Sequence, residues 1–190
     1  MERLRGLRAV LCSRNEHKRR ELEAALPDWT IELLDAQAFP AEHGETYHAN
    51  AAAKARFGRE LADVGVWVLG EDSGIEVEAL GGEPGVHSAC WSERPVEQLL
   101  DRLRGVTDRR VRYVCELVAI SPDGRQLRGT GVLEGRIASE PRGSEGFGYD
   151  PIFVPDGEAQ TVAELGDGWK AEHSHRARAA QALRGALPPA

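Results

Sequence analysis

The sequence predicts a mixed α/β fold built on one continuous β-sheet, and three observations support this prediction. Apolar runs with strand-like spacing alternate with helical spacing through the first half of the chain. In the second half, two apolar runs flank the turn signal Ser121-Pro122-Asp123-Gly124, which is typical of an antiparallel hairpin. No repeat or low-complexity linker divides the 190 residues, so we expect a single domain over residues 1–190.

The first elements are expected to be a strand, a helix and a second strand. Residues 7–12 form an apolar run, and residues 13–15 are a polar break. Apolar positions within 21–26 have helical spacing, and Pro27 ends that helix because proline cannot continue it. Residues 30–34 are then expected to form a short strand.

A polar loop over 35–45 leads to a second helix, in which small and apolar residues recur every three or four positions over 46–65. The apolar residues 66–69 predict a buried strand. Residues 70–74 (Gly-Glu-Asp-Ser-Gly) are expected to break the chain. The alternation over 75–80 then predicts another strand with one solvent-facing side.

The second half of the chain begins with helical spacing over 95–103. Strands over 112–120 and 127–132 are expected on the two sides of the hairpin turn. The segment 135–157 is rich in glycine and proline and is expected to be irregular. A last helix is expected from residue 174 or 175 to residue 187.

The composition indicates an ordinary soluble protein. There are 24 Lys and Arg against 31 Asp and Glu, a formal charge of −7, which disfavours nucleic acid as a partner. No apolar run approaches the ~20 residues of a membrane span, and the first residues lack the apolar stretch of a signal peptide. Three scattered cysteines favour a reducing, cytoplasmic location over a disulfide framework.

Four polar clusters lie at predicted strand or helix ends, where open α/β sheets bind ligands. The first, Ser13-Arg14-Asn15-Glu16-His17-Lys18, follows a strand and opens a helix. Free backbone N–H groups and Lys18 can together hold an anion such as a phosphate at such a corner. The alternative is that Ser13 or Asn15 only caps the helix.

The second cluster is the segment 70–74, where Glu71 and Asp72 are adjacent. Like charges this close are costly unless a cation shares them, and Mg²⁺ prefers carboxylate oxygens. Glu42 and Glu45 in the preceding loop could complete such a site, with one carboxylate acting as base toward a water molecule. The alternative is a solvated turn between two strands.

The third cluster is 143–151, whose glycines let the backbone approach a ligand and whose Phe147 and Tyr149 offer faces to a planar ring. Ordinary core packing of these aromatics is the alternative. The fourth combines Lys170 with residues 173–178 (His-Ser-His-Arg-Ala-Arg), a set of donors for phosphate or carbonyl oxygens. A basic, solvated helix start is the alternative. Together, the four clusters describe a site for a nucleoside polyphosphate with Mg²⁺.

Several separate motifs follow one another between roughly Leu7 and Leu183. They are Glu45-Thr46-Tyr47 with Asn50 and Lys54, Asp72-Ser73-Gly74, Ala79-Leu80-Gly81-Gly82-Glu83-Pro84-Gly85, Gly135-Arg136-Ile137, Glu140-Pro141-Arg142-Gly143, Gly146-Phe147-Gly148-Tyr149-Asp150-Pro151-Ile152-Phe153 and Ser174-His175-Arg176. In these motifs and in their order, the sequence resembles the inosine/xanthosine triphosphate pyrophosphatase family.

The resemblance implies a long mixed central sheet flanked by helices, with two lobes around an active-site cleft. It also implies Mg²⁺-dependent hydrolysis of ITP, dITP and XTP to the monophosphate and pyrophosphate, which removes deaminated purines from the nucleotide pool. A homodimer is implied as well. The alternatives are a related phosphatase of other base specificity and a nucleotide-binding module without catalysis.

The resemblance also assigns roles to residues. Asp72 would be the proton acceptor and a magnesium ligand, and Glu42 would be the second metal carboxylate. Arg14 stands where the family usually has glycine, and Glu71 where it more often has aspartate. The residues implied to bind substrate are Ser13, Arg14, Asn15, Glu16, His17, Lys18, Ser73, Phe147, Gly148, Tyr149, Asp150, Lys170, His175 and Arg176.

Overall fold

The computed structural model describes residues 6–187 and has one six-stranded sheet with the strand order β2-β1-β3-β4-β5-β6. β1 pairs in parallel with β2 and β3, whereas the remaining pairs are antiparallel. The predicted mixed α/β fold with one continuous sheet is therefore confirmed. The strands are β1 (Leu7–Leu11), β2 (Trp29–Leu33), β3 (Trp67–Val77), β4 (Arg110–Ile120), β5 (Gln126–Ile137) and β6 (Phe153–Pro155).

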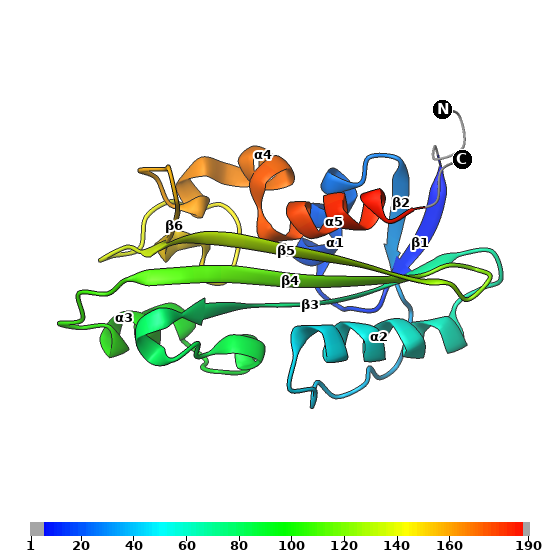
Figure 1. Ribbon diagram of the computed structural model, residues 1–190, viewed down its shortest axis with the longest axis horizontal. Coiled ribbons are helices and arrows are strands. Elements are labelled where there is room, and N and C mark those ends of the chain that lie inside the picture. The colour runs from blue at the N-terminus through cyan, green and yellow to red at the C-terminus, as the bar shows by residue number, and fades with distance from the viewer. Residues whose placement is uncertain (1–5, 188–190) are drawn as a thin grey trace.

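Helices cover both faces of this sheet (Figure 1). α5 packs against β4 and β5 together with α1, whereas α2 packs against the opposite face of β3. No helix within residues 6–187 has the length and apolar character needed to cross a bilayer. The expectation about a signal peptide concerns the first residues, which lie outside the described range. The helices are α1 (Glu16–Ala25), α2 (Tyr47–Leu61), α3 (Pro95–Arg102), α4 (Val162–His173) and α5 (His175–Gly185).

The predicted break at residues 70–74 is wrong, because β3 runs through it as one strand. Glu71 and Asp72 pair in register with Leu117 and Glu116 of β4. The glycines that suggested a turn serve close packing instead: a Cβ on Gly70 would lie 2.6 Å from the Ala55 nitrogen of α2. The alternative of a solvated turn is therefore excluded, and both carboxylates are buried within a strand.

The structure also adds a helix that the spacing did not reveal. α4 begins after Thr161, whose hydroxyl accepts from the Glu164 N–H while the Glu164 carboxylate accepts from the Thr161 N–H. Gly166, with φ of 83°, kinks α4, and this interruption weakens the apolar periodicity. The segment expected to be irregular contains the end of β5 and the short edge strand β6, and α5 ends at Gly185.

Two core clusters share one face of the sheet, the face that α5 covers. The first lies between the sheet, α1 and α5 and includes Leu69 of β3. The second lies toward the far end of the long strands and includes Ile75 of β3. Because alternate residues of a strand point to the same face, Glu71 and Ser73 lie on that face between the two clusters. The polar site is therefore located where the apolar core is interrupted.

Candidate active site

A cavity of about 280 Å³, here called the central cavity, lies at this interruption. Three cationic side chains, Lys18, Lys170 and Arg176, line it together with a single carboxylate, that of Asp150. The fold therefore gathers the first, third and fourth polar clusters of the sequence around one space. The other lining residues are Asn15, Ser73, Gly74, Ile75, Ser88, Ala89, Pro95, Tyr113, Phe147, Gly148, Tyr149 and His175.

The corner between β1 and α1 is built by capping interactions. Asn15 is the N-cap of α1, and its Oδ1 accepts from the backbone N–H groups of His17 (2.9 Å) and Lys18 (3.2 Å). The Ser13 hydroxyl accepts from the Asn15 N–H at 3.0 Å. Asn15 therefore caps α1, and this role leaves the predicted binding of an anion at the corner untested. Capping also orders the turn from which Lys18 reaches the central cavity.

Glu71 binds two of the cavity's cations. Its carboxylate lies 2.6 Å from Lys18 Nζ and 3.0 Å from Arg176 Nη2, whose guanidinium also donates to the Ser73 hydroxyl at 2.9 Å. Burial raises the pKa of Glu71, but the charges of Lys18 and Arg176 outweigh burial and hold this pKa well below its ordinary value. Glu71 therefore stays ionised and orders both cations. It does not share a cation site with Asp72, as the adjacency had suggested.

Glu21 of α1 is a site residue that the sequence analysis missed. Its carboxylate bridges Lys170, at 2.5 Å, and the Arg176 guanidinium. Burial raises the pKa of Glu21, but the charges of Arg176 and Lys170 lower it by more, so this pKa lies below its ordinary value. Glu21 lies one turn after Lys18 on α1 and directly before the buried Leu22. A charged residue this close to the apolar side of a helix was the one sequence signal that could have indicated its role.

Asp150 organises the glycine-rich loop before it. Oδ2 accepts from Lys170 Nζ at 2.7 Å and from the Phe147 N–H at 2.9 Å, and Oδ1 accepts from the Tyr113 hydroxyl at 3.1 Å. Burial raises the pKa of Asp150, and the Lys170 charge offsets only part of that shift. Because these groups occupy its oxygens, Asp150 holds the loop in place rather than offering a free acceptor to a ligand.

Aromatic rings form the walls of the central cavity. The Phe147 ring lies 5.1 Å from the His17 ring and 4.9 Å from Lys170 Nζ. The His175 ring stacks on Tyr113 at 4.5 Å. Among the described residues, His175 Nδ1 and the Tyr149 hydroxyl have no hydrogen-bond partner. Two buried polar atoms in such walls are suited to a planar ligand that carries both donors and acceptors.

The protonation states of these wall residues follow from burial. Burial and, after it, the nearby Arg176 charge hold the pKa of His175 well below its ordinary value, so the imidazole is neutral at pH 7. Burial raises the pKa of Tyr149 to about 12, so its hydroxyl keeps its proton. His175 offers one donor and one acceptor, and Tyr149 offers a donor.

Asp72 points to the opposite face of β3, toward α2. Its Oδ2 accepts from Asn50 Nδ2 at 2.9 Å, and its Oδ1 lies 3.4 Å from Lys54 Nζ. The Lys54 ammonium also contacts the Glu42 carboxylate, so it lies between the two carboxylates. Burial raises the pKa of Asp72, and the opposing effects of Lys54 and then Asn50 do not cancel it.

This arrangement fits a divalent cation that uses few protein ligands. Within residues 6–187, no three His, Cys, Asp or Glu side chains are grouped to hold a metal by themselves. Mg²⁺, however, is commonly bound by one or two carboxylates together with waters and substrate phosphates. Lys54 already places a positive charge between Glu42 and Asp72, so the two carboxylates lie on either side of one cationic group.

Four residues expected to bind substrate do not line the central cavity: Ser13, Arg14, Glu16 and His17. The Glu16 carboxylate pairs with Arg19 at 2.5 Å and with Arg20 at 3.4 Å, because these residues follow it by three and four positions on α1. The Arg14 side chain extends toward Gln37 and Phe39.

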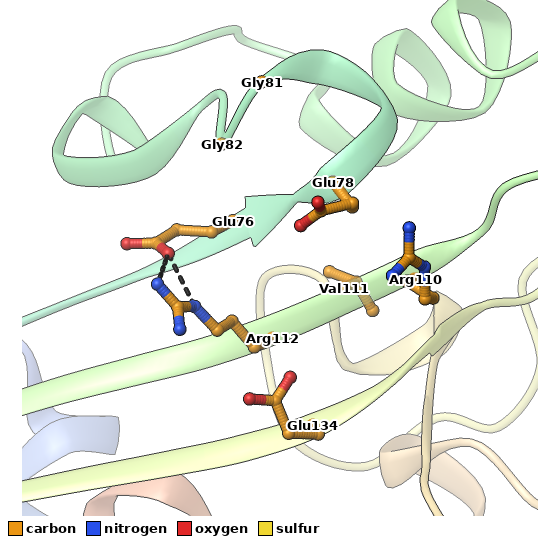
Figure 2. Close-up of a pocket in the computed structure, with 8 residues that line it drawn as sticks. All are labelled: Glu76, Glu78, Gly81, Gly82, Arg110, Val111, Arg112 and Glu134. Carbon is orange, nitrogen blue, oxygen red and sulfur yellow. Dashed lines mark hydrogen bonds and ion pairs between the residues drawn. The ribbon is translucent and has the colours of Figure 1, made fainter.

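A larger cavity of about 570 Å³, the outer cavity, lies at the far end of β3, β4 and β5. Figure 2 shows Glu76 bound to Arg112 through two contacts, with Glu134 below them on β5. Three carboxylates, those of Glu76, Glu78 and Glu134, face two arginines, so the lining is net negative. A polyphosphate is therefore better matched to the smaller, cation-rich central cavity.

Comparisons with known proteins found related sequences over most of the chain. The family model described as the Ham1 family matches residues 9–186. A protein of Deinococcus deserti named dITP/XTP pyrophosphatase is 43% identical over 98% of this chain and 94% of its own. A Thermus thermophilus protein of the same name is 41% identical over 95% of this chain and 91% of its own.

Solved structures show the same fold. The Ham1 protein of Staphylococcus aureus superposes with a TM-score of 0.81 at 33% identity and covers 94% of this chain and 96% of its own. A HAM1 protein of Coxiella burnetii superposes with a TM-score of 0.80 at 33% identity and covers 94% of this chain and 97% of its own. The similarity extends over most of the chain.

Proposed function

This chain belongs to the Ham1 family, and from that premise we propose that it hydrolyses dITP, ITP and XTP to the nucleoside monophosphate and pyrophosphate. The relatives' names support the reaction and the substrates. The proposal rests on the middle of β3, where consecutive residues point to two groups of polar side chains on opposite faces of the sheet. Glu71 and Ser73 face the cation-rich central cavity, and Asp72 faces Glu42 and Lys54.

In the proposed reaction, a water molecule attacks phosphorus in line with the leaving pyrophosphate. Asp72 accepts the proton of this water, because burial raises the pKa of its carboxylate and so makes it a better proton acceptor. Lys18, which pairs with Glu71, also binds the phosphate tail. Its positive charge then stabilises the negative charge that develops on the leaving pyrophosphate. Glu42 and Asp72 would hold Mg²⁺, which supplies positive charge and makes a nearby water more acidic.

The central cavity supports selection of purines with a 6-oxo group. Arg176 has five N–H donors, and four are used by Glu71, Glu21 and Ser73. The remaining Nη1–H and the neutral imidazole of His175 can donate to a carbonyl oxygen. The 6-amino group of adenine would leave these donors unpaired, and unpaired buried donors can discriminate by about 10⁴-fold.

The test is a substrate panel of dITP, ITP, XTP, GTP, ATP and dUTP, with orthophosphate measured before and after addition of inorganic pyrophosphatase, with and without Mg²⁺. The proposal expects orthophosphate only after that addition and only with Mg²⁺, from the first three substrates. Orthophosphate without the added enzyme would indicate the alternative phosphatase. Binding of dITP in calorimetry without turnover would indicate a nucleotide-binding module.

We also propose a homodimer in the cytoplasm. The three cysteines form no disulfide with one another, and Cys12 and Cys115 are buried thiols, which is consistent with a reducing compartment. Light scattering on the purified protein is expected to give about twice the 20.8 kDa of one chain. A mass of one chain at micromolar concentration would contradict the dimer.

A further inference from the structure

Arg14 lies between Ser13 and Asn15 in the corner that precedes α1, but its side chain leaves this corner. The guanidinium donates from Nη2 to the backbone carbonyl oxygen of Gln37 at 2.5 Å. Its central carbon also lies 5.3 Å from the centre of the Phe39 ring. Arg14 therefore connects the β1–α1 corner to the 35–45 loop, which lies between β2 and α2.

Other contacts attach the 35–45 loop to α2 and to the small apolar cluster of Cys12, Leu34 and Val68. Phe39 packs near Phe57 of α2, with ring centres 6.1 Å apart. Farther along, Glu42 pairs with Lys54, and the Gly44 N–H donates to Asn50 Oδ1 at 2.8 Å. These contacts fix the loop relative to α2 and Asp72. Arg14 adds a hydrogen bond and a cation–ring contact that join the loop to the phosphate side of the site.

We propose that Arg14 is a positioning residue that sets where the 35–45 loop presents the Glu42 carboxylate relative to the phosphate-binding corner. This inference rests on the proposed function, because it assigns Glu42 to a divalent cation. Arginine suits the role because its planar guanidinium can lie against an aromatic ring while one N–H donates to a carbonyl oxygen. Lysine cannot make both contacts in one geometry.

The first measurement is the binding of Mn²⁺, as a probe for Mg²⁺, to the nucleotide-free protein by electron paramagnetic resonance. Arg14→Ala is expected to weaken Mn²⁺ binding by about tenfold, the combined effect of one hydrogen bond and one cation–ring contact. Arg14→Lys should not restore it. Phe39→Leu removes the cation–ring contact but keeps the hydrogen bond to Gln37, so it should weaken binding by less than Arg14→Ala. Because the two changes share the cation–ring contact, the loss in the double variant should be smaller than the sum of the two single losses.

The matched control is Arg8→Ala on β1. Arg8 and its partner Glu32 are both largely exposed and 4.0 Å apart, so this variant removes an arginine of the same region without changing Mn²⁺ affinity. Glu42→Gln should lose most Mn²⁺ binding. An unchanged Mn²⁺ affinity in Glu42→Gln would overturn the inference, because Glu42 would then not bind the cation. Hydrolysis of dITP by the unmodified protein tests the proposed function separately.

The second measurement separates positioning from direct phosphate binding. Inorganic triphosphate is titrated into the protein in EDTA, where no divalent cation contributes. Positioning by Arg14 predicts the same affinity in Arg14→Ala and in the unmodified protein. Weaker triphosphate binding in Arg14→Ala, with unchanged Mn²⁺ binding, would overturn the inference and make Arg14 a phosphate ligand.

Discussion

Glu71 and Asp72 are neighbours in the sequence, but β3 directs their side chains to opposite faces of the sheet. Glu71 is ionised and orders Lys18 and Arg176, whereas the pKa of Asp72 is raised by burial. Two adjacent carboxylates thus have two different electrostatic environments. One is suited to holding cations in place, and the other is suited to exchanging a proton.

Replacing Asp72 tests this division of roles. Asp72→Asn is expected to lower kcat for dITP by about a thousandfold, because the amide cannot accept the proton of the attacking water. The fold should persist, since an amide can keep the contact with Asn50. Pyrophosphate release and urea unfolding measure the two effects. Glu76→Gln, on the same face of β3 but beside the outer cavity, should leave kcat unchanged; equal kcat values in both variants would refute the assignment.

His175 makes stability depend on pH. Its folded pKa is depressed, first by burial, so between the unfolded pKa of about 6.5 and the folded value only the unfolded chain takes up a proton. The stability contribution of neutral His175 is therefore present above pH 6.5 and lost as the pH falls below it. From pH 7.5 to 5.5 this group should lower the free energy of unfolding by about 1 kcal/mol.

The variant His175→Gln removes this proton uptake. Urea unfolding at the two pH values should show a smaller loss of stability in His175→Gln than in the unmodified protein, whatever the overall stability of the variant. The remaining pH dependence comes from groups that both proteins share. An identical loss in both proteins would mean that buried His175 does not titrate differently in the folded and unfolded states.

At the scale of elements, α5 lies close to β5, and this close packing positions the site residues at the start of α5. A Cβ on Gly131 would lie 2.4 Å from the Ala179 nitrogen, and a Cβ on Gly129 would lie 2.7 Å from the Leu183 nitrogen. Both glycines face the helix that begins with His175 and Arg176. The small residues of β5 therefore set the depth at which these two side chains enter the central cavity.

Gly131→Ala is expected to push α5 away from the sheet. The predicted result is a loss of about 2 kcal/mol or more in unfolding free energy, because backbone atoms must move to admit the methyl group. KM for dITP should rise as well, since Arg176 moves with the helix. Gly168→Ala on α4 is the control: no atom lies within 4 Å of the added carbon, so stability should be unchanged or slightly higher. Equal effects would contradict the packing argument.

Most elements could be predicted from periodicity, and the exceptions have physical causes. The hairpin turn at 121–124 and the end of α1 before Pro27 follow from local chemistry that acts within a few residues. The break at 70–74 was wrong because glycine marks both turns and close helix packing, and sequence alone does not separate these uses. α4 was missed because Gly166 interrupts its apolar spacing.

At the scale of the whole molecule, the fold joins clusters that are more than a hundred residues apart, such as Glu71 and Arg176. The chemical character of these clusters was readable from residue types alone. Their partners were not: Tyr113 is an ordinary strand residue in the sequence, and its contact with Asp150 exists only because β4 passes beneath the loop. The sequence therefore predicts what the site contains better than how it is held together.

The prediction of a single domain is tested by the tryptophans. Trp29 and Trp67 pack in the first core cluster, and Trp91 and Trp169 pack against the second. One variant replaces the first pair with phenylalanine, and another replaces the second pair. In each variant, urea unfolding followed by fluorescence should coincide with unfolding followed by circular dichroism, since β3 and β4 run through both clusters. Separate transitions in the two variants would indicate two independent units.

The pairing of Lys18, Lys170 and Arg176 with Glu71, Glu21 and Asp150 has a consequence for recognition. Long flexible side chains lose rotamer freedom when they are fixed, and here that loss occurs during folding. In the proposed site, an incoming nucleotide would meet side-chain cations that internal anions already hold in place, so its association would be an exchange of counterions with little further ordering.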